Sequence, residues 1–426
     1  MILDRTQPPA FQAIHDVRLP SVDTHVLDNG CPLYAVSIQQ QPVMRLELIL
    51  EAGTWFEDTP ATASFAVKML AEGTQQRTSA QISEYFDRYG AFLELNTGPD
   101  RSSVVIYCLT KHLPQVLPLV RELLTEPTYP DKELEDLRNI TLQNLRVNLE
   151  KNNFVAGVLF REKIFGTAHP YGRSQRPDTV EQVRRDTLVS FYERIIRARS
   201  FRVLLAGQVS LNEVALINET LGQLPVNDAD KPNPSFARPQ TRPEPTLLER
   251  PDSLQSSIRM GRMLFTRTHP DFFRMLVANE VLGGYFGSRL MKNIREEKGF
   301  TYGISSSVAS FRHEGYFLIG TDVKKENTQQ TLDEIRKEIR TLQTEPVPAD
   351  ELETVKNYMA GEFVGSLNTP FDIADRYKVI LLDGLPDDFL TNYIPNLRAV
   401  TTDDIMDVAN RYLLTDELVD VVVGGK

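Results

Sequence analysis

The stretch VLGGYFGSRLMKNIREEKGFTYGISSS, from Val281 to Ser307, has the most informative local pattern in the sequence. It opens with glycines and continues into a segment where Leu290 and Ile294 stand one helical turn apart. We expect Gly299 to end this helix, because glycine tolerates the positive φ found at helix ends. The β-favouring run Phe300–Tyr302 follows. The pattern predicts a helix, a glycine turn and a strand.

This order puts Arg295 in the last helical turn and Tyr302 at the start of the strand. A helix that folds back onto a strand can bring both side chains to one place. A guanidinium and a phenol there are two strong donors for a carbonyl oxygen or an oxyanion. The spacing alone fits a structural interpretation better, with a solvated Arg295 at the helix end and a packed Tyr302, since short motifs also match by chance.

The same residues resemble the C-terminal-domain signature of the pitrilysin/insulinase-type zinc peptidases (the inverzincins), which include the mitochondrial processing peptidase. The run LMKNIREEKGFTYGISSS carries the Arg and, seven residues later, the Tyr of that signature, and LGGYFGSRL resembles its preceding glycine turn. The resemblance implies that Arg295 and Tyr302 reach a zinc site across a closed chamber, contact substrate and stabilise the tetrahedral intermediate. It also implies that Gly283 and Gly284 bind substrate.

The chain repeats itself once. TEPTYPDKELEDLRN at 125–139 is echoed by TEPVPADELETVKN at 344–357, and the apolar run FRVLLAG of the first half is echoed by VDVVVGG in the second. Two echoes in the same order predict tandem copies of one α+β domain of about two hundred residues. The resemblance implies the same fold class, an α/β sandwich with a mixed, largely antiparallel sheet and helices packed on one face.

Composition sets the expected boundaries. The segment 225–245 holds many of the prolines and is predicted to be an extended linker. It separates a first domain at 23–224 from a second domain at 246–426, and residues 1–22 are predicted to form an N-terminal arm.

Peptide-cleaving members of the resembled family carry His-x-x-Glu-His on a helix of the first domain. The matching stretch here is SFAVKMLAEGT, with Ser64 and Lys68 at the histidine positions and Val67 at the glutamate position. The region of the further ligand offers only Gln143 and Asn144. Amides are poor zinc ligands, an ammonium group repels the cation, and valine cannot move a proton. The sequence therefore predicts no metal in this chain, and zinc is expected in a partner subunit.

Charge and composition exclude other classes. The chain of 426 residues has 41% apolar residues and a net charge of -11, which argues against nucleic-acid binding. No apolar run is long enough to span a bilayer, and no secretory signal opens the chain, so a cytoplasmic location is expected. Cys31 and Cys108 lie in apolar runs and predict buried thiols rather than a disulfide framework.

The resemblance therefore implies a non-catalytic subunit of a heterodimeric zinc metallopeptidase, inactive alone. Its partner would be a homologous zinc-binding subunit, to which it lends Arg295 and Tyr302 for the hydrolysis of peptides. Two alternatives stay open: a scaffold subunit without a proteolytic role, and a peptide-binding protein that works alone.

Overall fold

The computed structural model describes residues 13–38, 41–228, 234–236 and 244–425 of the protein. Most of the predicted linker and the first part of the predicted arm lie outside these residues. Ile14, Val17 and Leu19, from the described part of the arm, pack against the second half of the chain.

The first half forms a mixed sheet of six strands in the order β1-β2-β6-β3-β5-β4, in which only β2 and β6 are parallel. The strands are β1 (Asp23–Val26), β2 (Pro32–Ser37), β3 (Val43–Leu50), β4 (Phe92–Thr97), β5 (Ser102–Leu109) and β6 (Phe201–Gly207). Buried and part-buried residues tend to alternate along β5, whereas β3 is buried on both faces. The sheet is therefore covered on both sides at its centre.

The second half forms a sheet of five strands in the order β7-β11-β8-β10-β9, in which only β7 and β11 are parallel. The strands are β7 (Thr246–Glu249), β8 (Gln255–Leu264), β9 (Thr301–Ser310), β10 (Gly315–Lys324) and β11 (Val419–Gly424). This is the order of the first sheet without β1. The match confirms the predicted duplication of one mixed, largely antiparallel sheet.

Each sheet packs its outer face against helices of its own half, and each pairing encloses one hydrophobic core. The first set is α1 (Thr62–Lys68), α2 (Ser79–Arg88), α3 (Leu113–Thr125), α4 (Asp131–Leu149), α6 (Pro177–Glu181), α7 (Arg185–Phe191) and α8 (Leu211–Thr220), with short turns η1 (Thr54–Phe56), η2 (Met69–Ala71), η3 (Thr110–His112) and η4 (Tyr192–Ile196). The second set is α9 (Phe272–Asn279), α10 (Thr328–Thr344), α11 (Ala349–Gly365), α13 (Tyr393–Ala399) and α14 (Thr402–Tyr412), with η5 (Glu280–Gly284), η6 (Met291–Glu297), η7 (Lys325–Asn327) and η8 (Thr415–Glu417).

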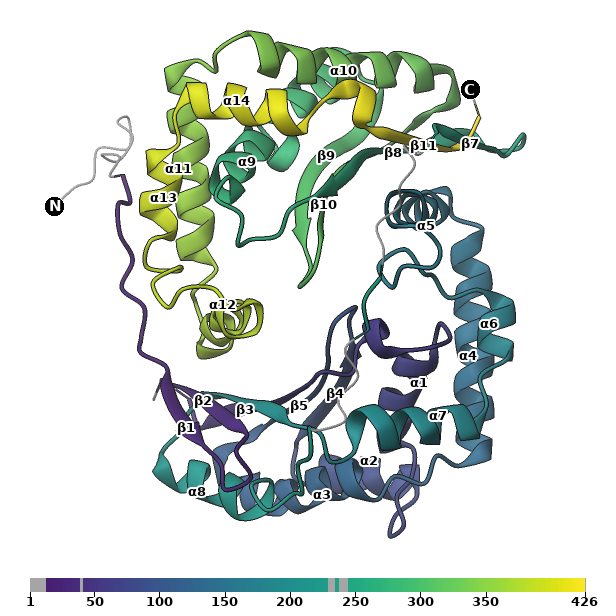
Figure 1. Ribbon diagram of the computed structural model, residues 1–426, viewed down its shortest axis with the longest axis vertical. Helices are drawn as coiled ribbons and strands as arrows, with labels where there is room; N and C mark the ends of the chain where they lie inside the picture. Colours follow the sequence, from purple (N-terminus) through teal and green to yellow (C-terminus); the bar gives the residue numbers. More distant parts are fainter. Residues whose placement is uncertain (1–12, 39–40, 229–233, 237–243, 426) are drawn as a thin grey trace, which may run out of the picture.

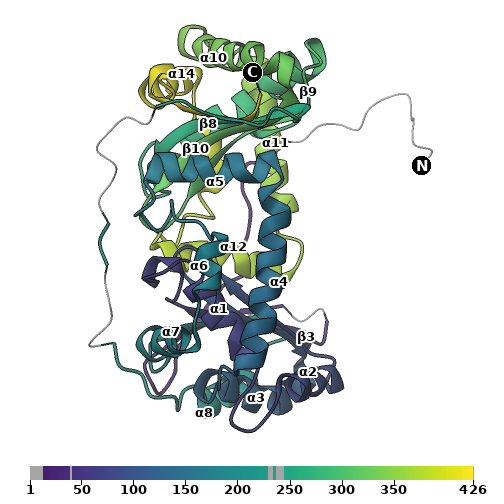
Figure 2. The ribbon, with the colours of Figure 1, turned by 90° about the vertical axis from the view of Figure 1, so that its right-hand side faces the viewer.

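Two further helices cross between the halves. α5 (Asn152–Phe165) comes from the first half and packs on the inner face of the second sheet, and α12 (Pro370–Asp383) does the reverse. Figure 1 shows both helices between the two sheets, and Figure 2 shows α4 running upright from the first half to the level of α5. Because α5 and α12 are exchanged, the inner face of each sheet is covered by a helix from the other half.

The two crossings differ in chemistry. On the second sheet, Phe160 of α5 packs with the β11 valines, and Gly261 leaves room for its ring, since a Cβ there would lie 2.9 Å from Phe160 Cζ. On the first sheet, Arg45 Nη1 donates to Asp375 Oδ2 of α12 over 3.0 Å and Nη2 donates to Oδ1 over 2.9 Å. The α5 crossing is apolar, whereas the α12 crossing pairs charged residues buried on the first sheet with half-buried charged residues of α12.

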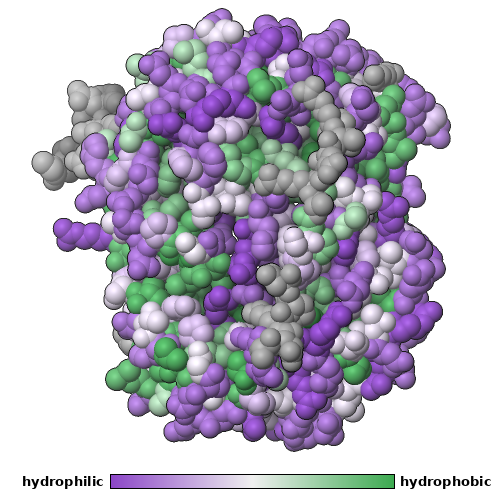
Figure 3. All heavy atoms as spheres, viewed as in Figure 1, coloured by the Kyte–Doolittle hydropathy of each residue, from purple (hydrophilic) through white to green (hydrophobic). Residues whose placement is uncertain are grey.

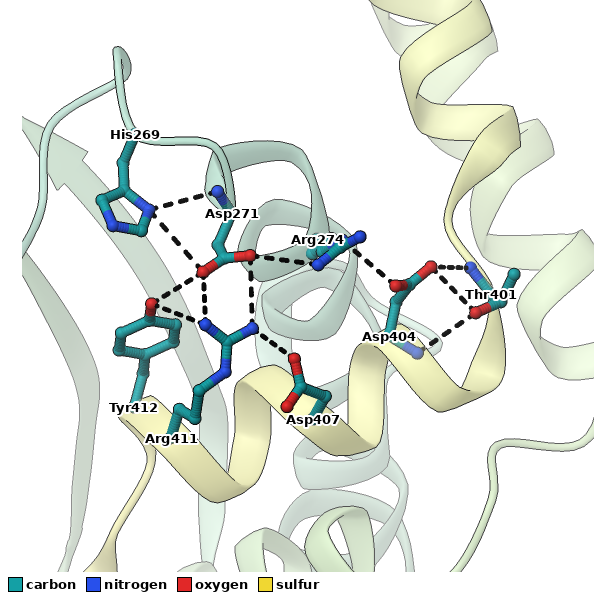
Figure 4. A network of polar contacts seen from close by, with 8 residues as sticks. All are labelled: His269, Asp271, Arg274, Thr401, Asp404, Asp407, Arg411 and Tyr412. Carbon is teal, nitrogen blue, oxygen red and sulfur yellow. Dashed lines mark hydrogen bonds and ion pairs between the residues drawn. The ribbon is translucent and has the colours of Figure 1, made fainter.

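A polar network fastens α9 to α14 (Figure 4). Buried Asp271 accepts hydrogen bonds from Arg411 Nη1 at 2.6 Å and from the Tyr412 hydroxyl at 2.7 Å. Although burial alone would raise the pKa of Asp271, these hydrogen bonds hold its pKa below the ordinary value. The Thr401 side chain caps α14 by accepting from the Asp404 amide over 3.1 Å.

The hairpin between β9 and β10 docks on the first half. Its His313 stacks on Trp55, with ring centroids 4.0 Å apart, and the Arg312 amide donates to Asp100 Oδ2 over 3.1 Å. The Tyr171 hydroxyl donates to the other oxygen of Asp100. Side chains from both halves thus share one aromatic cluster.

None of the helices that the structure describes is long and apolar enough to cross a membrane. Hydrophilic residues cover most of the face in Figure 3, and the hydrophobic ones lie in separated groups. Cys31 and Cys108 are both buried and free, as predicted.

Candidate functional site

The segment from η6 to β9 has the predicted order of helix, glycine turn and strand. Arg295 lies in the last turn of η6, which is π-helical, and Tyr302 is the second residue of β9. Gly299 has a φ of +65°, and the Phe300 amide donates to the Ile294 carbonyl over 3.0 Å. The glycine therefore turns the chain straight from the helix end into the strand.

The turn brings Arg295 and Tyr302 together, with a third residue, Phe286. The Arg295 Cζ lies 4.5 Å from the Phe286 ring centroid and 5.8 Å from the Tyr302 ring centroid. Tyr302 is 94% exposed and Phe286 is 64% exposed. A cation over an aromatic face gains about 0.5–1 kcal/mol at such exposed sites. The two rings therefore hold the guanidinium in place and leave its N–H groups available.

Neither the Arg295 side chain nor the Tyr302 hydroxyl has a hydrogen-bond or ion-pair partner within the described part of the chain. The N–H groups of the Arg295 guanidinium and the Tyr302 hydroxyl therefore stabilise no other part of the fold through hydrogen bonds. Two strong donors and an exposed aromatic ring, held side by side, can bind a carbonyl oxygen or an anion. This arrangement contradicts the packed-tyrosine interpretation that the spacing alone favoured.

Sequence reasoning missed Phe286. The signal was present, because a large aromatic residue stands in a loop between Gly284 and Gly287, where no apolar periodicity calls for it. Only the fold shows that its ring meets the Arg295 side chain.

The two glycines predicted to bind substrate lie in different surroundings. Gly283 is buried, and a Cβ there would lie 2.6 Å from Ser306 Oγ and 2.8 Å from the Ser306 nitrogen. Gly284 is exposed, although a Cβ there would lie 2.3 Å from Glu280 Oε2. Both glycines permit a close approach within the fold, and their contact with substrate stays a prediction.

A polar pocket of about 790 Å³ lies beside Tyr302, on the inner face of β8, β9 and β10. Gly303, Ser305 and Ser307 line it from β9, which is the edge strand of its sheet. An edge strand with small side chains leaves its backbone accessible to an extended peptide.

The degenerate motif lies on α1 in the first half. Val67 is fully buried in the hydrophobic core, and Lys68 is exposed to solvent. The Ser64 hydroxyl donates to the Ala61 carbonyl over 3.0 Å and accepts from Gln175 Nε2 over 3.0 Å. A hydroxyl already engaged, an aliphatic side chain and an ammonium group do not fit a zinc ion.

The residues in the region of the further zinc ligand do not supply a metal ligand either. Gln143 and Asn144 are exposed on α4. Over residues 13–38, 41–228, 234–236 and 244–425, no three His, Cys, Asp or Glu side chains group as metal ligands.

The start of α1 carries an unusual acid. Glu57 is buried, and its Oε2 accepts from the Ala63 amide over 2.9 Å. Burial raises the pKa of Glu57 to about 7, against the lowering effects of that hydrogen bond and of the Arg173 charge. Ala61, in the same turn, has a φ of +81°, which L-residues other than Asn and Asp rarely adopt.

Comparison with known proteins decides the family. Residues 34–164 match the family described as insulinase (peptidase family M16), and residues 182–359 match the one described as peptidase M16 inactive domain. The chain belongs to the M16 insulinase family. The resemblance drawn from its residues is thereby confirmed, and this member lacks the His-x-x-Glu-His motif.

Curated relatives span nearly the whole chain. The "Uncharacterized zinc protease YmxG" of Bacillus subtilis is 22% identical over 393 residues, which is 90% of this chain and 94% of that protein. The "Non-peptidase homolog YmxG" of Helicobacter pylori is 21% identical over 376 residues, which is 85% of this chain and 84% of that protein.

Solved structures share the fold. The peptidase M16 inactive domain from Pseudomonas fluorescens superposes with a TM-score of 0.85 at 23% identity, covering 95% of this chain and 98% of that one. A protease from Helicobacter pylori superposes with a TM-score of 0.87 at 18% identity, covering 96% of this chain and 100% of that one.

Proposed function

We propose that this M16-family chain is the non-catalytic subunit of a heterodimeric zinc metallopeptidase. It supplies Arg295 and Tyr302 to the zinc site of a homologous partner. The observation that carries the proposal is the contrast within the chain: the second half presents two unpartnered donors at its surface, and the first half has no zinc ligands at the motif positions.

In the pair, a zinc ion held by the His-x-x-Glu-His residues of the partner would supply an activated water and a polarised scissile carbonyl. Arg295 and Tyr302 donate hydrogen bonds to the substrate carbonyl, and these strengthen as negative charge develops on the oxygen. Phe286 orients the guanidinium, since it lies nearest to the Arg295 Cζ. The chain alone holds no zinc and cleaves no peptide.

The substrate class is an extended peptide. The free edge of β9 and the polar pocket beside it support this choice, because an added strand finds main-chain partners along such an edge. The same features suit the alternative of a peptide-binding protein that works alone. The name of the Helicobacter relative, a non-peptidase homolog, favours a role without proteolysis, such as that of a scaffold.

The experiment is reconstitution with an M16-family chain that carries His-x-x-Glu-His, taken from the same organism. Peptide turnover is measured for the wild-type pair and for pairs with Tyr302→Phe or Arg295→Ala, and assembly is checked by size-exclusion chromatography. Loss of one oxyanion donor costs roughly a hundredfold in turnover, about 3 kcal/mol. Tyr302→Phe removes only a hydroxyl, so the pair should still form.

Matched controls are Tyr358→Phe and Arg340→Ala, which change exposed residues on the outer helices α11 and α10. Both should leave turnover unchanged. Equal turnover in the wild type and in the two site variants, with the pair intact, would overturn the proposal and favour the scaffold. Peptide binding by a stable monomer that joins no zinc subunit would favour the solitary binder.

A further inference from the structure

The pocket on the inner face of the second sheet is built around an arginine that the proposed mechanism does not use. Arg259 of β8, Gly320 of β10 and Ser305 of β9 stand opposite one another across three strands. Gly320 has no side chain, and a Cβ there would lie 3.4 Å from Arg259 Nη1 and 3.5 Å from its Cζ. The guanidinium therefore lies over the glycine, inside the pocket.

The charge of Arg259 is uncompensated at close range. Nη1 donates to the Ile258 carbonyl over 2.8 Å, and Nη2 lies 3.4 Å from the Asn153 carbonyl at the start of α5. Among the residues that the structure describes, no carboxylate lies within ion-pair distance of Arg259. Burial lowers the pKa of Arg259, and the more distant Asp322 only partly offsets this. A half-buried guanidinium is normally matched by an anion.

The other residues that line the pocket favour an anionic ligand. Its charged lining consists of Arg259, Lys324 and Asp322, so cations outnumber carboxylates there although the chain carries a net charge of -11. One oxygen of Asp322 is already engaged, because it accepts a hydrogen bond from the Ser257 hydroxyl over 2.5 Å. Ser305 and Ser307 add hydroxyl donors from the facing strand.

We propose that this pocket is a carboxylate-binding subsite, in which Arg259 receives either the C-terminal carboxylate or an acidic side chain of a bound peptide. The planar guanidinium fork matches the two oxygens of a carboxylate. The peptide nature of the guest rests on the proposed function. Tyr302 and the edge strand β9 line the same pocket. Arg259 lies two strands in from that edge, so the C-terminus or an acidic side chain of a peptide lying along β9 meets Arg259 by crossing the pocket over Gly320.

The test measures binding to the full-length chain alone by fluorescence anisotropy. The probes are three fluorescein-labelled octapeptides of alternating alanine and valine: one with a free C-terminal carboxylate, one with a C-terminal amide, and one amide that carries a single internal glutamate. A charge-assisted hydrogen bond contributes about 1.5–3 kcal/mol, so a carboxylate-bearing probe should bind roughly tenfold or more tightly than the plain amide.

Variants assign the effect to the pocket. Arg259→Gln should abolish the preference for carboxylate, and Asp322→Asn should strengthen it, because it removes the competing negative charge. Arg262→Gln is the matched control, since it removes the same charge from the same strand where the arginine is paired with Glu417. This variant should keep the wild-type preference.

The two carboxylate-bearing probes distinguish the sources, since a C-terminal pocket prefers the free acid and a side-chain pocket prefers the internal glutamate. Equal binding of all three probes by the wild type would overturn the subsite, and so would a preference that survives in Arg259→Gln. Neither result touches the proposed function, which is tested separately by assembly of the pair and by its turnover with the Arg295 and Tyr302 variants.

Discussion

The two halves of the chain share one fold but differ in how far their motif residues are exposed. In the first half, Val67 of the former zinc motif is fully buried and packs in the core. In the second half, Tyr302 and Phe286 stand exposed, with Arg295 held between their rings. Large exposed aromatic groups next to an arginine are typical of binding surfaces. The residues at the first motif thus pack within the fold, whereas the second motif leaves its side chains exposed at the surface.

The sequence register supports this view of the first half. Pro60 and Gly73 flank α1 with the same separation as Pro270 and Gly283 flank α9, and Val67 then corresponds to Val277. Both valines are fully buried. The helix of the lost motif thus packs like its counterpart in the second half, where packing alone explains the valine.

The largest effect is expected from a glutamate at position 67, where the His-x-x-Glu-His motif carries one. Val67→Glu places a carboxylate without a partner in the hydrophobic core, and uncompensated buried charges cost about 3–5 kcal/mol. We expect a correspondingly large drop in the free energy of unfolding, measured in urea. Lys68→Glu, at the exposed neighbouring position, is the control and should stay within about 0.5 kcal/mol of the wild type. A stable Val67→Glu protein would show that the first half still holds a solvated site.

An effect of intermediate size is expected on the pH dependence of the free energy of unfolding, to which one glutamate of each half contributes. Burial raises the pKa of Glu57 in the first half and of Glu280 in the second from 4.5 to about 7. Because the folded pKa exceeds the unfolded one, the stabilisation is complete below pH 4.5 and is lost as the pH rises through 7. For Glu57 the change is on the order of 3 kcal/mol.

Unfolding free energies measured across this pH window check the prediction. Glu57→Gln keeps an acceptor for the Ala63 amide and should flatten the decline, and the double variant with Glu280→Gln should flatten it further. Wild-type stability that rises with pH over the same window would contradict the expected sign.

The smallest effect on stability is expected at the exposed site. Phe286→Ala should change the free energy of unfolding by no more than about 0.5 kcal/mol. It should lower turnover of the reconstituted pair about two- to fivefold, because a cation–π contact contributes about 0.5–1 kcal/mol. Phe92→Ala, an equally exposed phenylalanine on β4 of the first half, should alter neither quantity. If Phe92→Ala slowed turnover and Phe286→Ala did not, the assignment of the two halves would be reversed.

Local features were predictable from the sequence, and contacts between the halves were not. The positions of Arg295 and Tyr302 follow from a glycine that ends a helix, and the duplicated sheet follows from repeated motifs. The apolar side chains of α5 indicate burial but carry no signal for which sheet they meet. Arg259 stands in a strand whose pattern gives no sign that the facing residue is a glycine. Such pairings depend on register between distant strands, which one sequence does not reveal.

The exchange of α5 and α12 sets the order in which the protein can be completed on the ribosome. Domains at the N-terminus generally fold first as they emerge, yet here the inner face of the first sheet, with Arg45 and Glu47 on it, stays uncovered until α12 has been made. The sheet face that α5 covers is complete only when β11 has been made, which is the last strand among the described residues and a neighbour of both β7 and β8. Neither half can complete its packing by itself during synthesis. A nascent chain that ends before β11 therefore leaves incompletely packed surfaces, which chaperones and proteases can reach.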